Sequence, residues 1–511
     1  MDETTAPPAA PSPIARPPRR SWRLLLYALG MMLITFGFAW RYPLPRHSET
    51  LVDIGKLANY GIAEFIGYVG GVAALFLLYL LALRETRRAP RGALPIAIAS
   101  GGMLAATIAW MYPVNAIDLF IYAVRSRLLT TYGENPLAAR PADFPNDPFL
   151  AFASPEWADN VSPYGPLWNL IAAPITWLSD DDLLQALIGF KLLAVVSVLI
   201  GGWLIARTVA AARPGTEATA ALFYLWNPLV LWEGIGNGHN DVVMVVPLLL
   251  ALWTWVTRRD SVVIPLLLVA ALIKYVTVLV IPLAAVALWR RAGTGANRTR
   301  LALNSGLLSL LAVLVAFAPF YDLAAIAESI RAQTGIYLTS PAAMTIGLLR
   351  ETYPVTDLRQ WVSLTGQTIL VGGLCALSYA VWQRPDRLPR AIFEALFLFL
   401  MVATWNFRAW YLIWLVALAA LLPWGWPAIR TIVWTMGGLA VYAIFIWVWE
   451  WWGADFYSVQ NVAVPVMTGP ALLLTLIEIG IWLRRGRGPT TMSWREGRPE
   501  PGANVSVSSS R

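Results

Sequence analysis

The chain has 511 residues, of which 58% are hydrophobic and only 13% are charged. This balance excludes a soluble globular domain and indicates a protein that lies in a lipid bilayer. The formal net charge is +8, but the basic residues stand in short clusters between apolar segments rather than on one continuous face. Such clusters are typical of topology signals, so no nucleic-acid partner is expected.

The two ends of the chain differ from the rest in composition. Residues 1–20 are rich in Pro, Ala and Arg and are predicted to be a disordered cytoplasmic N-terminus. The first apolar segment, 22–41, is too long for the apolar region of a signal peptide, so it is predicted to be a retained helix. Residues 21–485 are the expected transmembrane domain, and 486–511 a disordered cytoplasmic C-terminus.

Between these ends, apolar segments long enough to cross a hydrocarbon core of roughly 30 Å recur along the chain. When the basic clusters are placed in the cytoplasm, both termini lie inside and about fourteen spans are predicted. The expected fold is therefore all-α, a multi-pass helical bundle in the cell membrane. The predicted spans are 22–41, 62–83, 93–113, 183–206, 218–235, 241–257, 261–273, 275–289, 301–320, 363–382, 391–405, 409–423, 431–451 and 467–483.

Three of the apolar stretches are short. The stretch 165–179 contains Pro166 and Pro174, which suit a juxtamembrane helix better than a full crossing. Segments 261–273 and 275–289 meet at Lys274 and are predicted to form a helical hairpin that does not cross fully. In this topology the polar loops, and any site built from them, face the extracytoplasmic side.

A polar, aromatic-rich stretch follows the third predicted span and forms the expected catalytic outer loop, 114–182. A helix starting near Ile117 would place Asp118, Tyr122 and Arg125 on one face. A carboxylate near lipid is costly and needs a reason, and one held at the membrane surface can take a proton from an acceptor hydroxyl. The alternative is an Asp that only caps the helix.

A second polar group, Glu233 with the turn 236–241, interrupts two apolar segments. Its His239 is predicted to donate to a phosphate or a sugar hydroxyl, with its protonation tuned by a neighbouring acid. The alternative is a simple polar turn. A divalent metal is not favoured, because a stable site needs three or four ligands and the single cysteine, Cys375, supplies no thiolate cluster. No cofactor is therefore expected.

Two cations, Lys274 and Arg408, stand between apolar runs. One interpretation is that they neutralise a lipid phosphate; the other is that they extend to the membrane interface. The sequence contains no phosphate-binding loop, dinucleotide fingerprint or nucleophile elbow, and the predicted cytoplasmic loops are too short to bind a nucleotide. Any activated donor would therefore have to arrive by another route, and a donor linked to a lipid within the bilayer meets that need.

At these residues the sequence resembles the GT-C superfamily of integral-membrane glycosyltransferases, and within it the bacterial polyprenol-phosphate-mannose-dependent α-mannosyltransferases. The resemblance covers roughly residues 93–420. Its motifs are Asp118-Leu119-Phe120-x-Tyr122, Gly133-Glu134-Asn135-Pro136, Ser162-Pro163-Tyr164-Gly165-Pro166-Leu167-Trp168, Trp226-Asn227-Pro228-Leu229-Val230, Gly238-His239-Asn240-Asp241 and Ile273-Lys274. The chain departs from the family at Leu137, where relatives often have Tyr, and in having two additional N-terminal segments.

The resemblance implies an inverting transfer of a sugar, mannose being expected, from a polyprenyl-phosphate donor to an extracytoplasmic glycan or glycolipid acceptor. Asp118 would be the general base, and Lys274, His239 and Arg408 would contact the donor phosphate. The other expected substrate-binding residues are Tyr122, Arg125, Asn135, Trp157, Tyr164, Trp168, Asn237, Asn240, Asp241 and Tyr411.

Two other functions remain open at this point. A transporter or flippase of lipid-linked sugars would also have many spans and charged groups at membrane depth. However, the sequence shows no internal repeat, and the polar groups gather at one predicted surface. A GT-C-like enzyme that modifies proteins or O-antigen is the other alternative.

Overall fold

The computed structural model describes residues 21–57, 59–88, 92–320, 324 and 339–485, with the backbone alone at 155, 156 and 485. The predicted disordered ends, 1–20 and 486–511, lie outside the described residues. Within them the protein is helical, with one isolated β-bridge, between Pro43 and Met111, and no strand. The predicted all-α, multi-pass class is confirmed.

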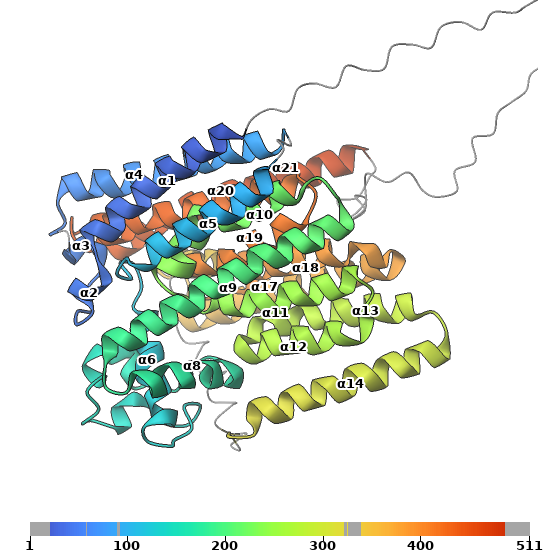
Figure 1. The fold of residues 1–511 in the computed structure, drawn as a ribbon, viewed down its shortest axis with the longest axis horizontal. Helices are drawn as coiled ribbons and strands as arrows, with labels where there is room; N and C mark the ends of the chain where they lie inside the picture. Colours follow the sequence, from blue (N-terminus) through green and yellow to red (C-terminus); the bar gives the residue numbers. More distant parts are fainter. Residues whose placement is uncertain (1–20, 58, 89–91, 321–323, 325–338, 486–511) are drawn as a thin grey trace, which may run out of the picture.

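Long helices run side by side along the molecule, and α6 and α8 lie together at one end (Figure 1). The helices of eight or more residues are α1 Trp22–Arg41, α4 Ile62–Thr86, α5 Ala93–Ala109, α6 Asp118–Thr130, α8 Pro166–Ser179, α9 Leu183–Ala212, α10 Glu217–Leu225, α11 Asp241–Val256, α12 Val263–Ile273, α13 Ile281–Ala292, α14 Gly295–Phe317, α16 Pro341–Leu349, α17 Val355–Gln383, α18 Leu388–Leu398, α19 Leu412–Leu421, α20 Trp426–Tyr442 and α21 Phe456–Arg485.

Shorter elements join them. The one-turn α-helices are α2 Leu44–His47, α3 Ile54–Leu57 and α7 Pro155–Ala158; the π-helices are η3 Val230–Gly236, η7 Phe399–Ala403 and η9 Ala443–Trp449; the 3-10 helices are η1 Pro141–Asp143, η2 Leu150–Phe152, η4 Asp260–Val262, η5 Tyr275–Val280, η6 Pro385–Arg387 and η8 Ala409–Tyr411.

Helix lies in each of the fourteen predicted segments, but not every helix is long enough to cross a membrane. In the described part of the chain, eight helices are long and apolar enough. A ninth span exists if η3 and α11, which are bent by 116° relative to each other, form one broken span. The segments at 93–109, 260–273 and 409–421 are shorter. The chain is thus a multi-pass membrane protein, and the count of about fourteen spans stays a prediction.

The connections at the end that carries α6 agree with the sequence analysis. The stretch predicted to be juxtamembrane is the 14-residue helix α8, which starts with Pro166, where a missing N–H does no harm. The apolar run around Lys274 breaks there, since α12 ends at Ile273 and η5 begins at Tyr275. However, η5 and α13 together, Tyr275–Ala292, are long enough to cross, so the hairpin that does not cross fully is not the only arrangement open.

A tight backbone contact joins the segment before α8 to this break. The Gly165 N–H donates to the Ile273 carbonyl at 3.1 Å, and Tyr275 Oη donates to the Tyr164 carbonyl at 3.4 Å. A Cβ atom on Gly165 would lie only 2.1 Å from the Leu272 carbonyl oxygen. Only glycine therefore allows the loop that carries Tyr164 to dock on the end of α12.

The C-terminal helices are fastened by a buried ion-pair network. Arg390 Nη2 lies 2.6 Å from Glu394 Oε1 and 2.8 Å from Glu478 Oε1, and Arg430 pairs with the same two acids. This network links α18, α20 and α21. Both arginines belong to the basic clusters that the sequence places in the cytoplasm as topology signals. In the structure, however, Arg430 is only 2% exposed and lies over the Phe397 ring.

Candidate active site

Asp118 is the first residue of α6, one position after the predicted start. Its carboxylate does not cap the helix: the N-cap residue is Ile117, without a side-chain cap. Instead, Oδ1 accepts a hydrogen bond from Tyr164 Oη at 3.0 Å, and Oδ2 lies 3.7 Å from His239 Nε2. The side chain is 23% exposed. The two oxygens thus face polar groups from two distant segments.

This environment keeps Asp118 ionised. Burial raises the pKa of the carboxyl, but the nearby His239, the charge of Arg408 and the hydrogen bond from Tyr164 together lower it to about 2. An opposite charge and a donated hydrogen bond both favour the carboxylate form. The group is therefore a proton acceptor at neutral pH.

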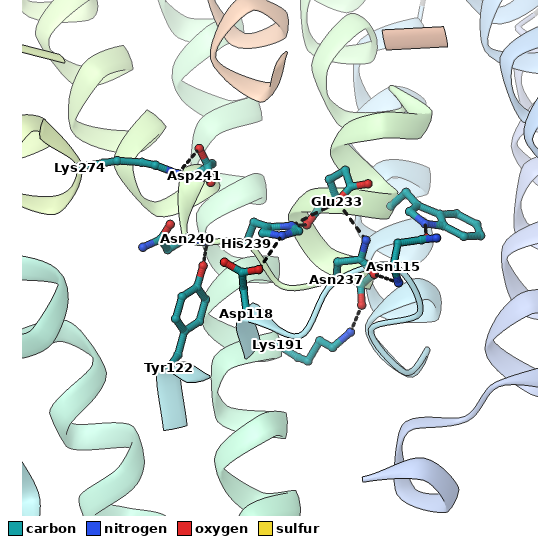
Figure 2. Close-up of polar contacts among 12 residues, drawn as sticks. Asn115, Asp118, Tyr122, Lys191, Glu233, Asn237, His239, Asn240, Asp241 and Lys274 are labelled. Carbon is teal, nitrogen blue, oxygen red and sulfur yellow. Dashed lines mark hydrogen bonds and ion pairs between the residues drawn. The ribbon is translucent and has the colours of Figure 1, made fainter. Parts of the chain in front are cut away.

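His239 is fully buried between two acids (Figure 2). Its Nδ1 lies 2.8 Å from the Glu233 carbonyl oxygen and 3.3 Å from Glu233 Oε2, while Nε2 faces Asp118. The imidazole stacks on the Trp410 ring, with 3.9 Å between centroids. The neighbouring acids of His239 are thus Asp118 and Glu233, whereas Asp241, two residues later in sequence, turns to another partner.

Asp241 pairs with Lys274. Lys274 Nζ donates to both carboxylate oxygens at 2.8 Å, and Trp414 Nε1 donates to Oδ1 at 2.5 Å. The ammonium group also lies 4.7 Å from the centroid of the Tyr411 ring. Asp241 is fully buried and the Lys274 side chain is 16% exposed. The ammonium group of Lys274 is thus held by a buried carboxylate.

Three of the aromatic residues predicted for the site, Tyr122, Tyr164 and Trp168, form one cluster beside Asp118. The Tyr122 ring lies 5.3 Å from that of Tyr164 and 4.8 Å from that of Trp168, both edge-on. Tyr122 Oη accepts from the Asn240 backbone N–H at 3.3 Å. Through this bond the face of α6 that carries Asp118 is joined to the turn that carries His239.

Asn237 connects that turn to the start of the outer loop. Its Nδ2 donates to Glu233 Oε2 at 2.9 Å, and its Oδ1 accepts from the Asn115 backbone N–H at 3.4 Å. Asn115 Oδ1 in turn accepts from Trp232 Nε1 at 2.6 Å. These amides fix the approach of the chain to α6.

Arg408 approaches the same group of residues from the C-terminal half. Its guanidinium is half-buried and lies 5.6 Å from the Trp410 ring centroid, and its charge acts on both Asp118 and Tyr411. In the described residues, Arg408 forms no ion pair with a carboxylate. It is therefore a cation available to an anionic ligand.

Three predicted residues lie apart from this cluster. Asn135 Oδ1 accepts from the Leu137 N–H at 2.9 Å and shapes a turn after α6. Arg125, two turns after Asp118, donates to the Trp157 and Asn160 carbonyls at 3.3 and 3.2 Å and lies 5.8 Å from the Trp157 ring centroid. Arg125 and Trp157 thus hold the outer loop against α6.

Several residues that build the site were not among the predicted catalytic and substrate-binding residues. Asn115 and Trp410 take part in the contacts above, as does Glu233, which the sequence singled out only as a polar interruption of an apolar segment. Buried Lys191 of α9 donates to the carbonyl oxygens of Met111, at 2.8 Å, and Gly236. The one usable signal was Lys191 itself, a charge inside a predicted span. The partners of the other residues depend on tertiary contacts that no local pattern reports.

A cavity of about 750 Å³ lies elsewhere. Among its lining residues are Glu49, Phe149, Phe152 and the acids 180–182. None of the polar residues around Asp118 lines it, so it is not the candidate site. For a metal, the described residues contain no group of three or more His, Cys, Asp or Glu side chains placed to hold an ion.

The fold and the site define a class: a multi-pass helical membrane protein in which an ionised Asp118, a buried His239 and an Arg408 without a carboxylate partner in the described part of the chain converge from distant segments. The sequence profile described as "Alpha-(1->6)-mannopyranosyltransferase, N-terminal domain" matches residues 25–290, about half of the chain. The chain therefore belongs to the alpha-(1->6)-mannopyranosyltransferase family. The matched region includes Asp118, His239 and Lys274 but not Arg408, Trp410 or Tyr411.

Curated relatives agree with this assignment over shorter stretches. The chain is 27% identical to Alpha-(1->6)-mannopyranosyltransferase B of Corynebacterium glutamicum over 248 residues, 46% of this chain and 41% of the relative. It is 31% identical to Alpha-(1->6)-mannopyranosyltransferase A of the same organism over 144 residues, 27% and 29% of the two chains. For the A protein of Mycobacterium tuberculosis the values are 28% over 187 residues, 35% and 36%. The chain thus spans less than half the length of each relative.

Proposed function

We propose that the protein is an inverting glycosyltransferase that moves mannose from a polyprenyl-phosphate donor to a glycan or glycolipid acceptor on the extracytoplasmic side of the membrane. The observation that carries the proposal is the ionised, partly exposed carboxylate of Asp118, held between Tyr164 and His239. The family and the names of the relatives support mannose as the sugar. The distribution of basic clusters supports the outward-facing site.

In the proposed reaction the acceptor hydroxyl attacks C1 of the donor sugar from the face opposite the phosphate. A bond forms between the acceptor oxygen and C1, and the bond between C1 and the phosphate oxygen breaks, with its electron pair going to the phosphate. Asp118 takes the hydroxyl proton as general base. Because attack and departure occur on opposite faces, a β-linked donor gives an α-glycoside.

Arg408 is the best candidate for binding the donor phosphate. Lys274 is already paired with Asp241 at 2.8 Å, whereas Arg408 is half-buried and forms no ion pair with a carboxylate among the described residues. A guanidinium can stabilise the negative charge that grows on a departing phosphate. Arg408 thus has the larger role in this proposal, and Lys274 mainly holds Asp241.

Donor binding also makes Asp118 a better base. A carboxyl with a pKa of about 2 is a weak base at neutral pH, since proton transfer is most efficient when the pKa lies near the working pH. Part of that lowering comes from the charge of Arg408. When an anionic phosphate neutralises Arg408, the pKa of Asp118 rises, so the base gains strength when its substrate is present.

The test is the Asp118→Asn variant with a radiolabelled polyprenyl-phosphate mannose in membranes. Loss of the general base is expected to lower the rate about 100- to 10,000-fold, with unchanged expression. Asp143→Asn is the matched control, because Asp143 lies in the same outer loop and its partner is Arg140, away from the site. Full activity of Asp118→Asn would remove this residue from the role of base.

Two further measurements separate this proposal from its alternatives. The bend of 116° between η3 and α11 is also a feature of transporters. A flippase would move label across vesicles without a new glycosidic bond, which mass analysis of the product detects. Transfer without a metal is part of the proposal, so EDTA should leave the rate unchanged; a loss that Mg²⁺ or Mn²⁺ restores would contradict it.

A further inference from the structure

Asn240 carries a buried amide that lacks hydrogen-bond partners. The residue is 1% exposed, and neither Oδ1 nor Nδ2 has a partner among the described residues. Leaving buried polar atoms unpaired costs free energy, and in native proteins such atoms are few. An amide with both ends unpaired therefore needs an explanation.

Asn227 shows what a structural asparagine looks like in the same chain. It is fully buried, but its Oδ1 accepts from the Leu229 N–H at 2.9 Å and its Nδ2 donates to Tyr79 Oη at 3.4 Å. That amide is satisfied at both ends by its own fold. The amide of Asn240 stabilises no such turn, since the N-cap position that it occupies in α11 has no side-chain cap bond.

Three other groups of the candidate site also carry a buried atom without a hydrogen-bond partner among the described residues. These atoms are His239 Nε2, Glu233 Oε1 and Asn115 Nδ2. Unlike these groups, the Asn240 side chain combines an unpaired acceptor and an unpaired donor. It can therefore make two hydrogen bonds of opposite direction to one ligand.

Asn240 lies in the chain between the residue that faces the base and the residue that holds Lys274. It follows His239, which faces Asp118, and precedes Asp241, which holds Lys274. Its backbone N–H donates to Tyr122 Oη at 3.3 Å. Figure 2 shows the amide on the side of the turn that faces Tyr122 and Lys274, away from Glu233 and Asn237.

We propose that Asn240 recognises the transferred sugar by binding two adjacent hydroxyl groups. The amide oxygen accepts from one hydroxyl and the amide nitrogen donates to its neighbour, a pairing that suits a vicinal diol of a pyranose because each hydroxyl can both donate and accept. This inference rests on the proposed function. In an inverting transfer the sugar lies between the base and the departing phosphate, which assigns the diol to the donor rather than to the acceptor.

The inference also explains why the amide is left unpaired. A site that buries polar atoms for a substrate hydroxyl rejects an analogue without that hydroxyl, because the atoms then stay unpaired. Since Asn240 is covered, sugar binding requires the neighbouring side chains to move apart. Discrimination among sugars, rather than rate alone, is thus the property to measure.

The experiment compares the 511-residue protein with its Asn240→Leu variant on donors that each lack one hydroxyl: 2-, 3-, 4- and 6-deoxymannosyl polyprenyl phosphates. For the unaltered protein, kcat/KM should fall about 10- to 100-fold at two adjacent positions. Asn240→Leu, similar in size but apolar, should lose about the same factor on the complete sugar and no longer discriminate at those two positions. A variant that discriminates as the unaltered protein does would overturn the inference.

Stability provides the control for a structural role. Asn240→Leu removes two unpaired polar atoms and should keep or raise the unfolding temperature, whereas Asn227→Leu breaks satisfied bonds and should lower it. An equal drop in both variants would mean that the Asn240 amide is structural, and the inference would fail.

A set of deoxy acceptors tests which substrate supplies the diol. Asn240→Leu should discriminate among these acceptors as the unaltered protein does. Lost discrimination among acceptors, with that among donors intact, would overturn the assignment to the transferred sugar. If the unaltered protein forms no glycoside, the proposed function fails as well; if it is active but its choice of donor does not depend on Asn240, only this inference fails.

Discussion

The ammonium group of Lys274 lies 2.8 Å from both carboxylate oxygens of Asp241, at the point where α12 breaks. The positive charge of Lys274, which the sequence suggested as a phosphate ligand, is therefore already paired with Asp241. Since Asp241 is fully buried, removing the lysine alone would leave an isolated charge, and such a loss is costly.

A double-mutant cycle tests this pair. Lys274→Met is expected to destabilise the protein by roughly 3–5 kcal/mol, and adding Asp241→Asn should restore most of that loss while keeping an acceptor for Trp414 Nε1. The measurement is the unfolding temperature in detergent for the two single variants and the double variant. If the double variant is destabilised by the sum of the single effects, the two residues are not energetically coupled.

Substitution of Arg408 should change donor binding rather than stability. Arg408→Gln removes a charge that has no carboxylate partner in the described part of the chain, so the unfolding temperature should hardly change. The KM for the polyprenyl-phosphate donor should rise about 10- to 100-fold, the loss expected for one hydrogen bond to a charged group. Arg140→Gln, at an exposed position paired with Asp143, serves as control. A normal donor KM for Arg408→Gln would exclude a phosphate contact.

The pH dependence of kcat/KM should reveal the environment of Asp118. Because its pKa is lowered to about 2, the free enzyme should show no acid limb from this group near neutral pH. His239→Gln removes one cause of the lowering, so an acid limb should rise toward or above the ordinary Asp value of about 3.9. An unchanged profile with retained activity would show that His239 does not act on Asp118.

The same shift affects stability, with a defined sign. A carboxyl whose pKa is lower in the folded than in the unfolded state stabilises the fold above the unfolded pKa, about 3.9 for Asp. That contribution is lost as the pH falls through about 2. Asp118→Asn should therefore weaken the acid sensitivity of unfolding in this window, which thermal scans between these pH values can measure.

Gly165 allows a test of the docking of the Tyr164 loop. A Cβ atom there would meet the Leu272 carbonyl oxygen at 2.1 Å, so Gly165→Ala should destabilise the protein by about 1–3 kcal/mol and displace Tyr164 from Asp118. Activity and the unfolding temperature should fall together. Gly372→Ala in α17, where a Cβ atom meets nothing within 4 Å, should leave both unchanged. A tolerated Gly165→Ala would mean that the contact is not needed.

The sequence predicted the helices and the breaks between them, because runs of apolar residues and their interruptions are local properties. It also predicted that Asp118 and His239 would meet, through the family resemblance and the side of the membrane on which their loops fall. Lys274 and Arg408 were selected because each interrupts an apolar run, which is again a local property of the sequence.

Local sequence patterns could not identify the residues that pair with these charged groups. Nothing near Lys274 in sequence indicates Asp241, 33 residues earlier, as its partner, and nothing near His239 distinguishes Glu233 from Asp241 as its acid. Likewise, Arg390 and Arg430 resemble cytoplasmic topology signals, since a count of basic residues does not record which of them have buried acids beside them. Pairing depends on how distant helices pack.

The stacking of His239 on Trp410 joins the region matched by the family to a later segment of the chain. The residues matched by the family end at 290, yet the imidazole rests on an indole contributed 120 positions downstream of that limit, and Asp241 bonds to Trp414 from the same later segment. The end of the region matched by the family is therefore not a structural boundary in the protein. A fragment that ends at residue 290 would lack the indoles that contact His239 and Asp241. Neither half of the chain is therefore expected to be active alone.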